Sequence, residues 1–230
     1  MRSNNSSNYN VDIVMCIDAT GSMGGLIDKV KSNALSFYSD LTKSMEAKGK
    51  NISQLRVRLV VFRDYLADGT QAMLQTEFLT LPEQDMQYKG FLDSVTAFGG
   101  GDNPEDGLEA LAFAMHNSKW TMEQGKHRHI IVVWTDAATH PLGFGKSAPN
   151  YPGKMAKSFD ELTAWWGDAD DPGCMPDQSA KRLLMFAPDE PYWNMITENW
   201  DNSILYPSDA GNGMDETDYA SILDVIANSI

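Results

Sequence analysis

The stretch that decides the fold is residues 11–22, VDIVMCIDATGS, in which a mainly apolar run ends at Asp18 and a short polar segment follows. Such a run is typical of a central parallel strand, which is covered on both faces. Two hydroxyl side chains, Thr20 and Ser22, lie in the polar segment, and apolar residues then recur at helical spacing from Leu26 onward. The stretch therefore predicts a buried strand, a tight polar loop and a helix of about four turns.

Later segments repeat this order of strand, polar loop and helix. Residues 54–62 and 129–136 are strand-like and lead to Asp64 and Asp136, and residues 77–81 form a weaker strand, predicted at an edge. Further helices are predicted at 87–95, after 106, and at 160–166, 191–200 and 218–230, and further strands at 182–187 and 204–205. The alternation predicts one α/β domain over residues 11–230, behind a polar tail of residues 1–10. Its sheet should be Rossmann-like, doubly wound and mostly parallel, with helices on both faces.

Composition narrows the function classes. The chain has 230 residues and a formal net charge of −14, which disfavours nucleic acid and anionic membranes as partners. Its two cysteines do not form a disulfide framework. The first ten residues are too polar for a signal peptide, and no apolar run approaches the ~18 residues that cross a bilayer. We expect a cytoplasmic protein, and its oligomeric state stays open.

Acidic residues follow the strands at the points where the strands end. Three of them are Asp18, Asp64 and Asp136, and a fourth loop supplies Asp102 and Glu105. Because the carboxyl ends of parallel strands meet at one edge of a sheet, we expect these carboxylates to gather there. Like charges in one place are costly unless a cation neutralises them. An oxygen-only donor set favours Mg²⁺, Mn²⁺ or Ca²⁺ over zinc.

The spacing Asp18-x-Thr20-x-Ser22 resembles the metal-ion-dependent adhesion site (MIDAS) of the von Willebrand factor A (vWA) family, which carries Asp-x-Ser/Thr-x-Ser after its first strand. Thr135-Asp136 is similar to the family's third metal loop. The resemblance covers roughly residues 11–230. It implies a vWA fold, a Mg²⁺ or Mn²⁺ ion held by these residues, and a partner protein that presents an Asp or Glu to that ion.

The middle loop, residues 99–106, is similar to that of integrin β-subunit heads and of the vWA domains associated with alpha-kinases. This resemblance implies that Glu105 is the carboxylate of the primary site. It also implies that Asp64, Asp102 and the carbonyl of Pro104 are candidates for a second cation site, which would suit Ca²⁺. The chain departs from the integrin pattern at two points, which put the second site in doubt and argue against a third: Gly100 replaces an Asn ligand, and Gly25-Leu26 replaces an acidic pair.

Structural roles compete with these assignments. Residues 18–22 could cap the first helix, and residues 103–106 form a good helix start with Pro at the first position. Asp64 could close a turn or pair with an arginine. The four histidines (116, 127, 129 and 140) lack zinc spacing and are interpreted as polar residues at the surface. Trp165 and Trp166 are interpreted as core residues.

Two functions remain. The first is a divalent-metal-dependent protein-binding module, with residues 137–160 as a long loop that lies beside the metal and helps to select the partner. The alternative is a metal-dependent phosphotransferase or phosphohydrolase that uses a strand-end Asp. The nearest such class needs a second Asp two residues after its nucleophile, where this chain has Thr20, and the chain contains no P-loop motif. We therefore expect a protein without catalytic activity.

Overall fold

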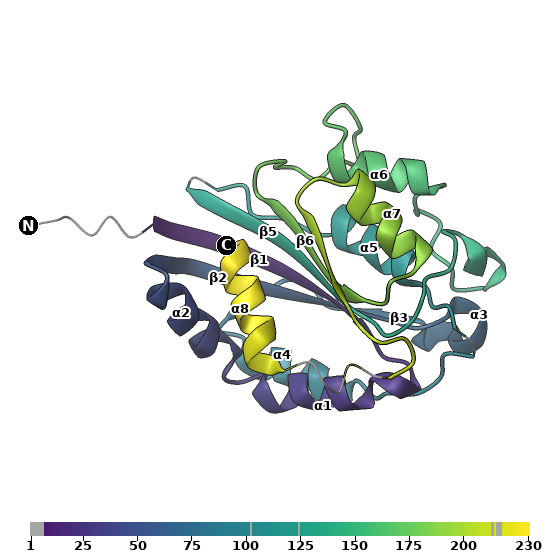
Figure 1. Ribbon diagram of the computed structural model, residues 1–230, viewed down its shortest axis with the longest axis horizontal. Coiled ribbons are helices and arrows are strands. Elements are labelled where there is room, and N and C mark those ends of the chain that lie inside the picture. Colours follow the sequence, from purple (N-terminus) through teal and green to yellow (C-terminus); the bar gives the residue numbers. More distant parts are fainter. Residues whose placement is uncertain (1–6, 102, 124, 213, 215–217) are drawn as a thin grey trace, which may run out of the picture.

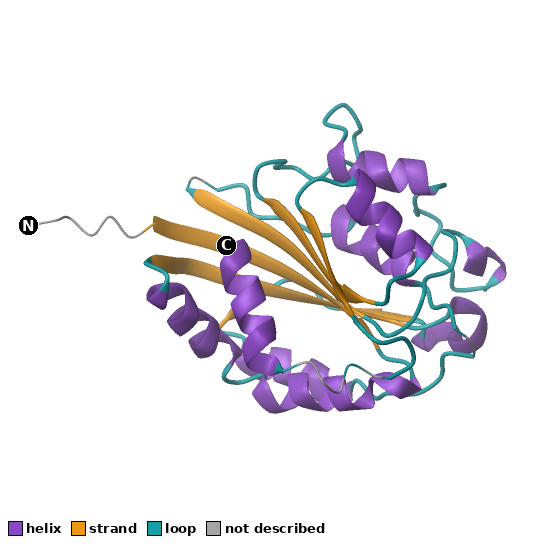
Figure 2. Cartoon of the chain, in the orientation of Figure 1, coloured by secondary structure: helices purple, strands orange, loops and turns teal. Residues whose placement is uncertain are grey.

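The computed structural model describes residues 7–101, 103–123, 125–212, 214 and 218–230, which form a seven-stranded sheet between two helical layers (Figures 1 and 2). The strands follow the order β3-β2-β1-β5-β6-β7. β4 also pairs with β2, along residues 55–57, whereas β3 pairs with residues 60–62. Their bounds are β1 (Ser7–Asp18), β2 (Lys50–Phe62), β3 (Met73–Gln75), β4 (Leu79–Leu81), β5 (Lys126–Trp134), β6 (Lys181–Ala187) and β7 (Ser203–Pro207).

The five longer strands are parallel. β1 pairs with β2 on one side and β5 on the other, and β6 and β7 extend the sheet beyond β5. The short strands β3 and β4 run antiparallel to β2. The predicted α/β fold with a mostly parallel sheet is therefore confirmed.

Helices cover both faces of this sheet (Figure 1). One layer contains α1 (Gly24–Asn33), α2 (Phe37–Ala47), α4 (Asp85–Ser94) and α8 (Tyr219–Ser229). The other contains α5 (Gly107–His116), α6 (Phe159–Gly167) and α7 (Pro191–Asn199). The remaining short elements are α3 (Tyr65–Asp68) and three 3-10 turns, η1 (Gly21–Met23), η2 (Gly69–Gln71) and η3 (Phe144–Ser147).

The alternation of side chains in β1 explains why its sequence is apolar almost throughout. Ile13, Met15 and Ile17 pack in the core under α1, α2 and α8. Val14 and Cys16 pack in the core under α5 and α7. Because each face needs apolar side chains, alternate positions on both sides are apolar. Trp165 and Trp166 are buried in the second core, as expected.

Several boundaries differ from the prediction. β1 begins at Ser7, so residues 7–10 of the predicted tail belong to the sheet. The first helix is split at residues 34–36. Side chains just before the split bond back to the main chain: Ser32 Oγ donates to the Asp28 carbonyl at 2.7 Å, and Asn33 Nδ2 to the Lys29 carbonyl at 2.8 Å. Such bonds compete with regular helix and favour a bend.

The order in which successive strands are added to the sheet reverses at β1. From β1 it proceeds to β2 on one side, and it later returns to β5 on the other. In open α/β sheets, ligands bind at such a switch point, outside the carboxyl ends of the strands. Asp18 ends β1 and Asp136 follows β5, so both lie at this position. Among the described residues, no helix is long and apolar enough to cross a membrane.

Candidate metal-binding site

Asp18 lies at the centre of the site and is fully buried. Its Oδ1 accepts hydrogen bonds from the Thr20 main-chain N at 2.9 Å and the Thr20 hydroxyl at 2.7 Å. Its Oδ2 accepts one from the Thr135 hydroxyl at 2.7 Å. Burial raises the pKa of Asp18 to about 6, despite these hydrogen bonds. The loop after β1 is thereby folded back onto the strand end.

The second hydroxyl of the motif, that of Ser22, contacts Asp136, which follows the end of β5. Ser22 Oγ donates to Asp136 Oδ1 at 2.9 Å, which joins segments 114 residues apart. In both pairs the hydroxyl proton is directed at a carboxylate, so the lone pairs of Thr20 and Ser22 stay available to a cation. This is the pattern of a hydroxyl ligand held in place by an outer carboxylate.

Glu105 reaches the same place from the middle loop. Its main chain is fixed on both sides, because its N donates to the Ala138 carbonyl at 3.0 Å and its carbonyl accepts from His140 N at 2.8 Å. The residue is 4% exposed, and its buried Oε2 has no hydrogen-bond partner within the described part of the chain. Burial, with the nearby charges of Asp18 and Asp64, raises the pKa of Glu105 to about 9. A buried, unsatisfied carboxyl oxygen is costly and calls for a compensating group.

A pocket of about 260 Å³ is lined by residues of the loop after β1, of the middle loop and of the segment after β5, together with Gly211. Glycine is required at one wall, because Gly100 has a φ of +72° and a Cβ there would collide with Glu105 and lie 2.6 Å from Thr20 Cγ2. The lining residues of most interest are Thr20, Ser22, Gly100, Glu105 and Asp136. Five of the predicted ligands thus gather, four of them around this pocket and Asp18 directly beneath Thr20.

Asp64 has a different environment. Its Oδ1 caps α3 by accepting from Leu66 N at 2.5 Å and Ala67 N at 2.9 Å. Its Oδ2 lies 3.1 Å from Nε2 of His140. Asp64 therefore closes a turn, as one interpretation proposed, but the side chain that it pairs with is a histidine and not an arginine. Asp102, the other acid predicted for a second site, lies outside the described residues.

The sequence interpretation missed several buried polar residues, of which His129 lies near the start of β5, away from this site. His140 and His129 are buried, so the expectation of surface histidines is wrong for both. Asp106 and Glu109 are fully buried, and burial raises the pKa of each, for Asp106 to about 8. Asp106 accepts from Tyr65 N at 2.6 Å, and Glu109 from Gly143 N and the Tyr151 hydroxyl at 2.8 and 2.9 Å. The sequence signal that could have indicated Glu109 is an acidic residue inside an otherwise apolar helical run.

Arg63 was also missed, although it directly precedes Asp64. Its side chain is buried and donates to the carbonyls of Ala19, Gln71 and Thr96 at 3.0, 2.6 and 2.7 Å. Arg63 thus connects the loop after β1 to the segment before the glycine-rich turn, residues 99–101. A charged residue at the end of an apolar strand is the signal that could have identified it.

The capping interpretations are wrong for both motifs. Thr20 precedes η1 and Met23 precedes α1, and neither makes a side-chain capping bond. α5 begins only at Gly107, three residues after Pro104, and Asp106 before it makes no capping bond either. The polar groups of residues 18–22 are instead directed at one another and at Asp136.

The donor set is suited to a hard divalent cation. In the described part of the chain, no three His, Cys, Asp or Glu side chains form a group that could hold a metal by themselves. A metal here would have to use the hydroxyls of Thr20 and Ser22 with the carboxylates. Hydroxyl and carboxylate oxygens are ligands of Mg²⁺ and Mn²⁺, and the unsatisfied Glu105 oxygen fits the same interpretation.

The fold and this arrangement of strand-end residues define a von Willebrand factor A domain. Residues 12–141 match the sequence model of von Willebrand factor A domains, and because this is more than half of the chain, the protein belongs to that family. The predicted family is therefore confirmed.

Two similar proteins illustrate the range of its relatives. Alpha-protein kinase vwkA of Dictyostelium discoideum is 25% identical over 143 residues, which is 62% of this chain and 21% of the kinase. The crystal structure of the pilus adhesin SpaC from Lactobacillus rhamnosus GG is 13% identical and superimposes with a TM-score of 0.51, covering 97% of this chain and 30% of the adhesin. The chain thus spans under a third of either protein, and the adhesin supports the fold alone.

Proposed function

We propose that this domain is a divalent-metal-dependent protein-binding module. The single observation that carries the proposal is the gathering of the hydroxyls of Thr20 and Ser22 with Glu105 and Asp136 around one pocket, above the buried Asp18. Thr20, Ser22 and Glu105 are the proposed ligands of Mg²⁺ or Mn²⁺. Asp18 and Asp136 orient the two hydroxyls and hold ordered waters or ligate directly.

A bound Mg²⁺ or Mn²⁺ supplies positive charge and one exchangeable coordination position, which an acidic side chain of a partner can occupy. This property explains how a chain with a net charge of −14 would bind an acidic partner at all. Without the cation, the carboxylates of Asp18 and Asp136 would repel the partner's carboxylate. Binding should therefore be abolished by chelators.

Exposed apolar side chains on segments linked to the site support a protein partner. Leu66 in α3, Phe98 directly before the lining residue Gly99, and Phe144 in η3 are 49%, 41% and 49% exposed. Phe98 stacks under the Arg63 guanidinium at 4.2 Å, and Phe144 on the His140 ring at 3.9 Å. Apolar groups held rigidly around a polar centre are a common feature of protein-binding surfaces. Phe144 lies in the predicted partner-selecting loop, residues 137–160.

A phosphotransferase that attacks through Asp18 is the alternative, and the geometry disfavours it. Both carboxylate oxygens of Asp18 accept hydrogen bonds, and the side chain is fully buried. A nucleophile must reach its substrate, and an acid or base must stand within hydrogen-bond distance of it. At the position of that acid, Thr20 offers only a hydroxyl. We therefore propose a module without catalytic activity of its own.

A second cation, more suitably Ca²⁺ than Mg²⁺, is proposed beside Glu105 with Asp64, Asp102 and the Pro104 carbonyl as its ligands. In the described residues, Asp64 would have to give up its bonds to α3 and His140 to serve it. Crystals soaked in Ca²⁺ should show anomalous density between Asp64 and Glu105. Density at the primary site alone, with the Asp64–His140 pair intact, would reject the second site.

The decisive experiment is affinity capture from the native host, with Mg²⁺ and again with EDTA. Wild type should retain a partner only with Mg²⁺, and Asp18→Ala should retain none. Phe144→Ser should keep its metal affinity, measured by calorimetry, but capture less partner. Capture that is equal with EDTA, or hydrolysis of phosphoesters that Asp18→Ala abolishes, would overturn the proposal.

A further inference from the structure

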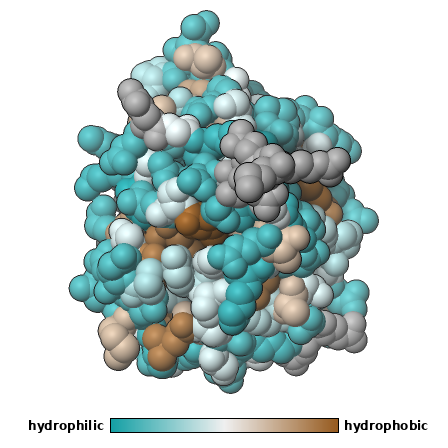
Figure 3. Space-filling view, turned by 90° about the vertical axis from the view of Figure 1, so that its left-hand side faces the viewer, coloured by the Kyte–Doolittle hydropathy of each residue, from teal (hydrophilic) through white to brown (hydrophobic). Residues whose placement is uncertain are grey.

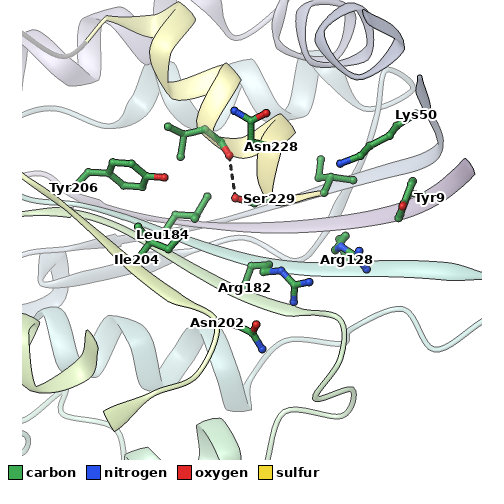
Figure 4. A pocket seen from close by; sticks show the side chains of 12 residues that line it. Tyr9, Lys50, Arg128, Arg182, Leu184, Asn202, Ile204, Tyr206, Asn228 and Ser229 are labelled. Atoms are coloured by element: carbon green, nitrogen blue, oxygen red, sulfur yellow. Dashed lines mark hydrogen bonds between the residues drawn. The ribbon is translucent and has the colours of Figure 1, made fainter. Parts of the chain in front are cut away.

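A second pocket, of about 420 Å³, lies at the opposite end of the sheet from the metal-binding site. It is formed where β1, β2, β5 and β6 begin and where α8 ends (Figure 4). Its positive charges come from Lys50, Arg128 and Arg182, and among the described residues no Asp or Glu side chain lines it. In a chain with a net charge of −14, such a local excess of positive charge needs an explanation.

Strand register places the two arginines together. Arg182 of β6 pairs with Ile130 of β5, and Arg128 lies two residues before Ile130. Successive side chains of a strand alternate between faces, so both arginines project from the same face on neighbouring strands. Like charges in this diagonal position repel each other. The pKa of Arg182 is accordingly lowered, by burial and by the charge of Arg128.

Main-chain carbonyls, not carboxylates, accept the hydrogen bonds of both arginines within the described residues. Arg128 donates to the His127 carbonyl at 2.8 Å, and its Nε is buried without a partner. Arg182 donates to the carbonyls of Ser179 and Lys181 at 3.0 and 2.6 Å. Asp201, whose charge reaches Arg182, is already paired with Lys181 at 2.8 Å. Unused donor capacity therefore remains at the pocket.

Part of the remaining wall is apolar, while Asn202, Asn228 and Ser229 contribute polar side chains to it. Leu184, Ile204 and Val225 line the pocket together with the ring of Tyr206, and Ile204 is 47% exposed. The face in Figure 3, which shows the left-hand side of Figure 1, carries a hydrophobic area bordered by hydrophilic residues. A ligand that fits this wall combines a strongly anionic group with an apolar body. The volume is in the range of small-molecule sites.

The arginines also have a possible structural role. α8 ends beside them, and the free carbonyls at a helix C-terminus carry partial negative charge that attracts cations. Arg128 additionally lies 5.2 Å from the centre of the Tyr9 ring. Neither contact uses the buried Nε of Arg128 or fills the pocket.

We propose that this pocket binds a phosphate monoester that carries an apolar or aromatic body. Two guanidinium groups and an ammonium group match a phosphate dianion better than a singly charged carboxylate, because guanidinium groups donate in pairs to adjacent phosphate oxygens. The apolar wall of Leu184, Ile204 and Tyr206 receives the body of the ligand. Neither the site nor its ligand class depends on the proposed metal site.

Thermal unfolding and calorimetry of the full chain test this proposal, with EDTA present throughout so that phosphate cannot act through a bound metal. The probes are phenyl phosphate, inorganic phosphate and benzoate at constant ionic strength. Phenyl phosphate should raise the melting temperature by mass action and bind at least ten times more tightly than the other two. Arg128→Gln and Arg182→Gln should each weaken it at least tenfold. Lys157→Gln, which removes one exposed charge elsewhere, should not.

Three results would overturn the proposal. One is that phenyl phosphate leaves the wild-type melting temperature unchanged while the arginine variants unfold at lower temperature, since the arginines then serve only the end of α8. Another is that phenyl and inorganic phosphate bind equally well. The third is that the arginine variants bind as well as Lys157→Gln. If either arginine variant fails to fold, Lys50→Gln provides the same comparison.

Discussion

At Glu105 the requirements of stability and of metal binding are opposed. Burial and the neighbouring acids raise the pKa of this carboxyl to about 9. A folded-state pKa above the unfolded value means that the folded protein holds the proton more tightly. Without metal, the stabilisation that comes from this tighter proton binding is fully present below the unfolded pKa of about 4.5. It is lost as the pH rises through the folded pKa of about 9. A cation takes the place of that proton, so metal affinity should rise over the same range.

Glu105→Gln should therefore stabilise the metal-free protein at pH 8. We expect a gain of more than ~1 kcal/mol, or a few degrees in melting temperature, because one pKa unit corresponds to about 1.4 kcal/mol. The gain should shrink toward pH 5, because the unfolded chain, with its pKa of about 4.5, then also begins to bind this proton. Thermal unfolding in EDTA at pH 5 to 8 measures it, with the exposed Glu198→Gln as the control. A variant less stable than wild type at pH 8 would show that Glu105 is not buried as an uncompensated acid.

Gly100 should be among the most sensitive residues of the site. Its φ of +72° costs a residue with a side chain about 1–2 kcal/mol, and a Cβ would press on Thr20 and Glu105. Gly100→Ala should lower the unfolding free energy by at least that amount and weaken Mg²⁺ binding. Gly153→Ala is the control, because Gly153 has open space around it. Unaltered Mg²⁺ affinity in Gly100→Ala, measured by calorimetry, would mean that Glu105 and Thr20 are not held as described.

The sequence could indicate the site residues that lie at the ends of strands, because the apolar run before each of them marks where the strand ends. Ser22 contacts Asp136 because β1 and β5 are parallel neighbours; the apolar runs predict the parallel strands and their converging ends, and the structure adds that the two strands are adjacent. The pairing of Asp64 with His140 could not be predicted in this way, because it joins two loops 76 residues apart in sequence. Loop contacts depend on the packing of the whole chain and have no periodic signal.

At the scale of elements, α5 is the helix most dependent on its surroundings. Every residue from Gly107 to Met115 is buried, including Glu109. The loop of residues 137–160 donates to Oε1 of this acid from Gly143 N and the Tyr151 hydroxyl, while its Oε2 is buried and has no partner among the described residues. The loop is thus part of the structural support of α5 as well as a rim of the metal-binding site. Replacing all of it would remove that support, so a single substitution is the cleaner test.

Tyr151→Phe should lower the free energy of unfolding by about 1–3 kcal/mol, the usual cost of removing one partner from a buried hydrogen bond. The hydroxyl donates to Glu109 at 2.9 Å, and no exposed surface of Glu109 is left for water to compensate. Urea unfolding measures the change, and Tyr192→Phe provides a matched loss of a hydroxyl from a ring packed on the same core. Equal effects of the two substitutions would show that Glu109 is neutral or satisfied otherwise.

The length of an element decided how well it could be predicted. β1, β2, β5 and β6 have long apolar runs covered on both faces, and each was predicted. β3 was not predicted, because three residues that pair antiparallel with the end of β2 have no pattern of their own. The bend between α1 and α2 was missed because the apolar spacing continues through it, while Ser32 and Asn33 locally favour main-chain bonds.

For the molecule as a whole, the two ends of the sheet differ in charge. The carboxyl ends of the strands carry the buried acids Asp18, Glu105 and Asp136, and the amino ends carry the basic pocket. The net charge of −14 should make metal-free protein sensitive to salt through repulsion at its surface. Salt screens exposed charges well and buried charges poorly. NaCl and Mg²⁺ should therefore stabilise the protein in two distinguishable ways.

Ser22→Ala separates the two effects, because it removes a proposed ligand and leaves the net charge unchanged. Raising NaCl from about 0.02 to 0.5 M in EDTA should raise the melting temperature of wild type and variant alike, since the screening length for exposed charges falls from roughly 20 Å to roughly 4 Å. A few millimolar Mg²⁺, added at 0.5 M NaCl, should then raise the wild-type melting temperature further and saturably, by binding to the folded state. The variant should gain much less, because the Ser22 hydroxyl that lies 2.9 Å from Asp136 is gone. If both proteins gain equally from Mg²⁺, the ion acts elsewhere on the acidic surface, and the strand ends do not hold it.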